Sequence, residues 1–104
     1  MNTSVLLTQY FSTNSPNVSA ECDRLMEELI RREEDDPTVR DAAVSVDSGP
    51  GIVIVEVVAD GEDERSATQA GIARIFASVS SIVELREHPL QERDRSTQIL
   101  QQAC

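Results

Sequence analysis

The chain has 104 residues, of which 19 are acidic and 9 basic, so its formal net charge is −10. This length fits one domain with a modest core, and the small aromatic content, Tyr10, Phe11 and Phe76, makes that core aliphatic. A surface that follows phosphate groups needs a basic stripe, so the charge balance argues against nucleic acid and anionic membranes as partners.

The sequence shows no export or membrane-spanning signal. Met1–Ser4 carries no positive charge, and the apolar run Val5–Leu7 is too short for the apolar part of a signal peptide. No segment approaches the ~20 consecutive apolar residues of a transmembrane helix. We therefore expect a cytoplasmic protein whose two cysteines, Cys22 and Cys104, are reduced thiols.

The first two predicted elements are a strand and a helix. Val5–Phe11 is rich in apolar residues and predicts a strand, and residues 12–17 are rich in Ser and Asn, which is typical of a connector. The segment Glu21–Asp36 predicts a surface helix with one apolar stripe, which Pro37 ends. That stripe consists of Val18, Cys22, Leu25, Met26 and Leu29.

A hairpin is the clearest feature of the middle of the chain. Val39–Asp47 alternates apolar and polar residues, which predicts a half-buried strand. Ile52–Ala59 is the only long apolar run and is rich in β-branched residues, which predicts a buried strand. Ser48–Gly51 between them is a turn signal in which Gly51 can adopt a positive φ. We therefore expect these strands to pair antiparallel around the turn.

A second helix is predicted after this hairpin. Residues 60–64 are acidic and suit the positive end of a helix dipole, and Ser66 with Gln69 fits a capping box. The apolar face of this helix carries Ile72, Ile75, Phe76 and Val79. Ile82–Glu87 is interpreted as a short last strand. Residues 1–88 then form one α+β domain, and residues 89–104 form a mobile or loosely docked tail.

The order strand, helix, strand, strand, helix, strand predicts a ferredoxin-like α+β sandwich, with two helices on one face of a four-stranded antiparallel sheet. The two outer strands are the weaker part of the pattern. Without them the remainder is an α-β-β-α unit that dimerisation would complete.

No stretch carries a catalytic or ligand-binding signature. A single histidine, His88, and the lack of a Cys-x-x-Cys pair argue against zinc, and the acidic runs lack the alternating ligands of a calcium loop. Phosphate-binding glycine loops and nucleophile motifs are also missing. The sequence therefore predicts no metal and no cofactor.

Glu56 is the only charged residue inside the central strand. On an open sheet face it would be solvated, whereas enclosed in a dimer it could act as a proton donor or acceptor. The same strand face carries Ile52, Ile54 and Val58, which predict an apolar patch around Glu56. We therefore expect a homodimer that forms through this face.

Acidic residues gather on and after the first predicted helix. Such a face suits a basic protein partner whose association weakens as salt is added. The candidate partner-binding residues are Glu27, Glu28, Glu33, Glu34, Asp35 and Asp36.

Three functions of different classes agree with these patterns. The main expectation is a non-catalytic interaction or regulatory module that self-associates through its sheet. The second is an immunity or inhibitor protein that neutralises a basic partner. The third is a small dimeric α+β-barrel enzyme with Glu56 or His88 in a pocket.

Overall fold

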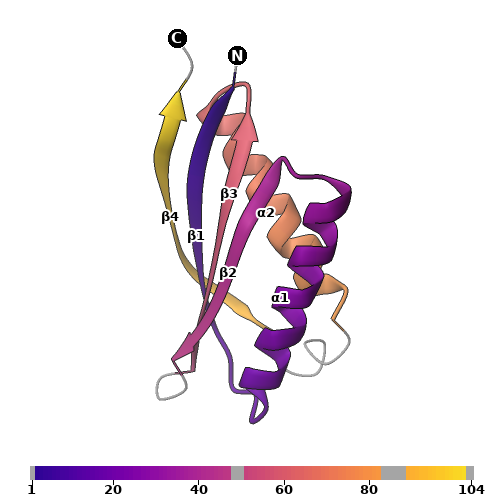
Figure 1. Cartoon of the computed structure of the whole chain (residues 1–104). Helices are drawn as coiled ribbons and strands as arrows, with labels where there is room; N and C mark the ends of the chain where they lie inside the picture. Colours follow the sequence, from indigo (N-terminus) through magenta and orange to yellow (C-terminus); the bar gives the residue numbers. More distant parts are fainter. Residues whose placement is uncertain (1, 48–50, 83–88, 103–104) are drawn as a thin grey trace.

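The computed structural model describes residues 2–47, 51–82 and 89–102. Its elements are β1 (Thr3–Ser12), α1 (Val18–Asp35), β2 (Val39–Asp47), β3 (Ile52–Gly61), α2 (Glu64–Ser80) and β4 (Gln91–Gln102). The strands form one antiparallel sheet in the order β2-β3-β1-β4, and both helices lie on one of its faces (Figure 1). The predicted ferredoxin-like fold is confirmed. The first strand forms where expected, whereas the fourth strand is a different segment of the chain.

The central strand β3 divides the sheet into two unlike faces. Its residues Val53, Val55, Val57 and Ala59 are fully buried beneath the helices. The alternate residues, which include Glu56, point to the other face and are half-buried. Because successive side chains of a strand point to opposite sides, the sequence pattern alone fixes which set needs the helices.

The predicted hairpin joins β2 and β3. Gly51 has a φ of +70° as expected, and its N–H donates a hydrogen bond to the Asp47 carbonyl at 3.0 Å. A Cβ atom at Gly51 would lie 2.5 Å from the carbonyl oxygen of Thr13, so only glycine fits here. Residues 48–50 of the expected turn lie outside the described residues.

The helices meet the sheet through small and apolar side chains. From α1, Cys22, Leu25 and Leu29 are buried, as the apolar stripe predicted. On α2, Gly71 allows close approach, because a Cβ there would lie 2.9 Å from the Leu7 side chain. The cap of α2 differs from the prediction: the side chain of Asp63, not that of Ser66, accepts a hydrogen bond at the helix start.

The last strand lies later in the chain than predicted. Ile82 is buried but not in a strand, and residues 83–87 of the expected strand lie outside the described residues. The fourth strand is instead Gln91–Gln102, within the segment expected to be a tail, so the sheet continues past residue 88. Its mostly polar sequence gives no strand pattern, and backbone pairing with β1 holds it in place.

Cys22 provides a test of the packing between α1 and the sheet. Burial, followed by the charges of Glu21 and Asp23, raises the pKa of its thiol to about 11. In a Cys104→Ser variant, we expect Cys22 to react with a thiol reagent at pH 8 at least about a hundredfold more slowly than in the unfolded chain. Equal rates in native and denatured protein, measured by absorbance, would contradict this packing.

Candidate functional site

The face of the sheet that the helices leave uncovered, called here the open sheet face, gathers the residues predicted for self-association. Ile52, Ile54, Glu56 and Val58 lie along β3 and are all half-buried. The neighbouring strand β1 places Leu6 opposite Val58 and Tyr10 opposite Ile54. The predicted apolar residues therefore extend over two adjacent strands.

Strand register arranges this face in rows that run across the sheet. The middle row contains Ala43, Glu56, Thr8 and Ser96, one residue from each strand. Within it the Thr8 hydroxyl donates a hydrogen bond to Glu56 Oε2 at 3.3 Å. The rows on either side pair Val58 with Leu6 and Ile54 with Tyr10 at their centres, and polar residues of β2 and β4 lie at their ends. The Glu56 carboxylate therefore lies between two such pairs of β1 and β3 side chains.

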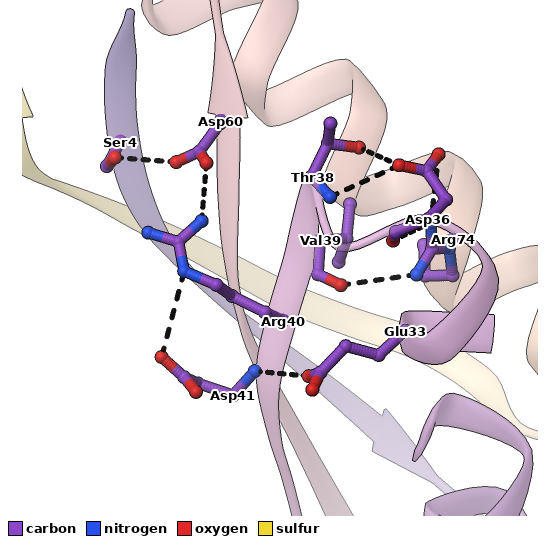
Figure 2. Close-up of polar contacts among 9 residues, drawn as sticks. All are labelled: Ser4, Glu33, Asp36, Thr38, Val39, Arg40, Asp41, Asp60 and Arg74. Atoms are coloured by element: carbon purple, nitrogen blue, oxygen red, sulfur yellow. Dashed lines mark hydrogen bonds and ion pairs between the residues drawn. The ribbon is translucent and has the colours of Figure 1, made fainter. Parts of the chain in front are cut away.

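A polar cluster of Ser4, Arg40 and Asp60 lies at one end of the open sheet face (Figure 2). Asp60 accepts hydrogen bonds from the Ser4 hydroxyl at 2.6 Å and from the guanidinium of Arg40. Burial alone would raise the pKa of Asp60, but the hydrogen bonds from Ser4 and Arg40 outweigh it and lower that pKa. The cluster therefore joins β1, β2 and β3 through one ionised carboxylate.

The same region contains an irregularity in β2. The pairing with β3 shifts register between Arg40 and Ala43, and Asp41 there has a φ of +55°. The Asp41 N–H donates to Glu33 Oε1 of α1 at 2.8 Å. Such bulges bend a strand and redirect its side chains. The hydrogen bond from Asp41 to Glu33 fixes this bulge to α1.

Arg74 connects the two helices to the start of β2. Its side chain is only 10% exposed and forms an ion pair with Asp36 at 3.2 Å. It also donates to the carbonyl of Val39 at 3.2 Å and to that of Asp36 at 2.9 Å (Figure 2). Asp36 in turn accepts hydrogen bonds from the backbone and hydroxyl of Thr38, so these contacts are structural.

Several residues of the predicted acidic face have internal partners. Glu28 accepts hydrogen bonds from Arg31 at 2.5 Å and from Arg32 at 2.8 Å. The bond from Arg31 is the main cause that lowers the pKa of Glu28 to about 2, although burial acts in the opposite direction. Glu33 and Asp36 hold the contacts described above. Asp35 forms a longer ion pair with Arg31 at 3.8 Å. The exposed remainder is Glu27 and Glu34, so a basic partner would meet fewer available carboxylates than the sequence suggests.

Other features of the sequence give no site within the described residues. His88 lies outside them. Among the residues that the structure does describe, no group of three or more His, Cys, Asp and Glu side chains could hold a metal ion. In the same parts of the chain, no helix has the length and apolar character needed to cross a lipid bilayer.

Sequence reasoning missed one buried carboxylate, that of Glu21. It is 6% exposed and accepts a hydrogen bond from the Ser15 hydroxyl at 2.6 Å. Glu21 follows Val18 by three residues and precedes Leu25 by four, so it belongs to the apolar stripe of α1. A charged residue at a stripe position was the signal that could have identified it.

No protein family model and no curated protein matches the chain. Several solved structures resemble it. A putative antibiotic biosynthesis monooxygenase from Chloroflexus aurantiacus has a TM-score of 0.56 and 12% sequence identity, and the match covers 97% of this chain and 96% of the Chloroflexus chain. Rv0793 from Mycobacterium tuberculosis has a TM-score of 0.52 and 13% identity, covering 97% and 96%. A conserved protein from Methanosarcina mazei has a TM-score of 0.52 and 16% identity, covering 97% and 94%.

These similarities show a shared fold along nearly the whole chain, β4 included. They also overturn the main functional expectation from the sequence. The expectation of a non-catalytic interaction or regulatory module was wrong, because a structure with the same fold carries the name of a putative antibiotic biosynthesis monooxygenase.

The Asp60 cluster predicts a pH-dependent contribution to stability. The pKa of Asp60 is lower in the folded than in the unfolded chain. Its contribution to the free energy of unfolding is therefore fully present above about pH 4, the ordinary pKa of aspartate. That contribution is lost as the pH falls through the pKa that Asp60 has in the folded chain. We expect Asp60→Asn to lower the free energy of unfolding by about 1 kcal/mol at pH 7, and by less at pH 3.

Urea denaturation at both pH values measures this difference. The matched control is Asp23→Asn, on the exposed side of α1, which should change stability by less than about 0.5 kcal/mol. A loss in Asp60→Asn that is equally large at pH 3 would contradict the proposed role of the ionised carboxylate.

Proposed function

We propose that the protein is a small enzyme that acts on an organic molecule, and that it works as a homodimer of the α+β-barrel type. In this arrangement the open sheet faces of two copies pack together and enclose Glu56. The observation that carries the proposal is the Glu56 carboxylate, which pairs with Thr8 and lies between the Val58–Leu6 and Ile54–Tyr10 pairs, in a fold shared with a putative antibiotic biosynthesis monooxygenase.

Two properties of the sheet support the dimer. Ile54 and Val58 of β3, with Leu6 of β1, are half-buried on a face that no helix covers. Covering each of these side chains contributes about 1 to 2 kcal/mol. In addition, Asp94, Ser96 and Gln98 of β4, which pair with the open-face residues of β1, are exposed. A second copy supplies the cover that both regions lack.

The chemistry of the proposed site depends on enclosure. Between two sheets, Glu56 is removed from bulk water, and the Thr8 hydroxyl fixes the orientation of its carboxylate. A carboxylate held in this way accepts a proton from a substrate hydroxyl or an acidic C–H group. Loss of that proton makes the substrate richer in electrons and easier to oxidise, which suits the monooxygenase class of the Chloroflexus structure.

The acidic composition of the chain bears on its partners. A formal net charge of −10 supports a function without nucleic acid as a partner, since phosphate groups would be repelled. We retain the cytoplasm as the proposed location. The exposed carboxylates Glu27 and Glu34 remain a candidate surface for a basic protein.

The dimer is tested by Ile54→Asp. A carboxylate placed at the centre of the packed faces lacks a partner and costs more than the interface gains from that side chain, so we expect the variant to be a folded monomer. Light scattering measures the mass, and circular dichroism checks the fold. Ile30→Asp is the control, because Ile30 is 47% exposed on α1, on the opposite side of the sheet.

A native protein that is monomeric would refute the dimer. An Ile54→Asp variant that stays dimeric would show that any association uses another surface.

The enzymatic role is tested with a panel of hydroquinones and other dihydroxy aromatic compounds under air, with an oxygen electrode. We expect oxygen consumption by the native protein and a rate at least about a hundredfold lower in Glu56→Gln, since a positioned proton acceptor contributes at least this much. Glu62→Gln, an exposed residue before α2, should keep the native rate. An unchanged rate in Glu56→Gln would exclude Glu56 as the proton acceptor.

A further inference from the structure

Carboxylates surround one pair of side chains on the open sheet face, that of Tyr10 and Ile54. These two residues lie directly opposite each other on β1 and β3, and both are half-buried. On its other side, Tyr10 lies opposite Asp94 of β4. Residues opposite each other in antiparallel strands have Cβ atoms about 5 Å apart, so Asp94 is the direct neighbour of Tyr10 on this face.

Two further carboxylates lie near the same pair. Glu56 follows Ile54 by two residues on β3, so it points to the same face about 7 Å further along the strand. Asp47 of β2 lies opposite Ile52 and is therefore a diagonal neighbour of Ile54, at about 7 to 8 Å. The Tyr10–Ile54 pair thus has a carboxylate on three sides, each from a different strand.

No basic side chain in the paired register compensates these three charges. Among the described residues that pair across the sheet, Arg40 is the only basic one on the open sheet face, and its guanidinium is bonded to Asp60. Arg93 lies in the bulge of β4, outside the register, and Arg95 belongs to the helix side, where it donates to a β1 side chain. The surface around the Tyr10–Ile54 pair is therefore negative.

The spacing of the carboxylates selects the kind of cation. In the described parts of the chain, no group of three or more acidic, His or Cys side chains could hold a metal ion. An organic cation needs only one close carboxylate, and its apolar part can cover Ile54. The ring of Tyr10 adds a further attraction, since a cation over an aromatic face is stabilised by the ring electrons.

We propose that the substrate of the enzyme is an aromatic amine. Its ammonium group lies beside Asp94 and Tyr10, and its ring lies on Ile54, within reach of Glu56 as the proton acceptor. The inference rests on the proposed function, because a second copy must enclose the face before these charges attract a small molecule strongly.

The experiment compares three compounds of nearly the same shape and different charge: 2-phenylethylamine, 2-phenylethanol and phenylacetate. Each is titrated into the native full-length protein in 0.15 M salt while the methyl signals of Ile54 and Val58 are followed by NMR. The Debye length is then about 8 Å, which screens carboxylates elsewhere on the chain. We expect the amine to bind at least about tenfold more tightly than phenylacetate, with the alcohol between them.

Asp94→Asn tests the assigned contact. Asparagine keeps the side-chain oxygen that accepts the Arg95 N–H, so the variant removes only the charge. We expect it to weaken binding of the amine by about threefold to fivefold, the effect of one partly exposed ion pair, and to leave binding of the alcohol unchanged. The matched control is Asp23→Asn on α1, which removes one charge from the other side of the sheet and should change neither.

Equal affinity of the native protein for the amine and phenylacetate would overturn the proposal. So would an equal effect of Asp94→Asn and Asp23→Asn, because only the net charge of the protein would then matter. None of the three compounds has a ring hydroxyl, so the titration does not depend on turnover. Oxygen consumption that requires Glu56, without a preference for the amine, would keep the proposed enzyme and refute only its substrate class.

Discussion

The structure depends on the pairing of β3 with β1 and β2 at the centre of the sheet. This pairing turns the side chains of Val53, Val55 and Val57 to one face, where both helices must lie to exclude water from them. The opposite face keeps its apolar residues half-buried around Glu56. Every later feature follows from this division, because the helices can cover only one side.

The two sides of the sheet place their carboxylates in different surroundings. On the open sheet face, Glu56 is half-buried and has a hydroxyl partner on the next strand. On the helix side, Glu21 is buried with one oxygen paired and the other unpaired among the described residues. Asp60, in contrast, is neutralised by Arg40 and contributes to stability. The burial and the hydrogen-bond partners of these three carboxylates, more than their residue type, distinguish their surroundings.

The likeness to solved structures concerns the fold as a whole and gives no residue of the site. At 12–16% identity the shared feature is the arrangement of helices and strands. The site proposal therefore depends on this chain's own contacts, above all the hydrogen bond from Thr8 to Glu56 across β1 and β3. The name of the Chloroflexus structure contributes only the class of reaction.

The sequence by itself determined the hairpin, both helices and the apolar set of β3, because these depend on periodicity and turn chemistry within short segments. Only the tertiary structure decided the fourth strand, since Gln91–Gln102 is mostly polar and is held by backbone pairing with a strand about 90 residues earlier. It also decided the surroundings of Glu21, because only the folded chain buries this carboxylate and places the Ser15 hydroxyl against it.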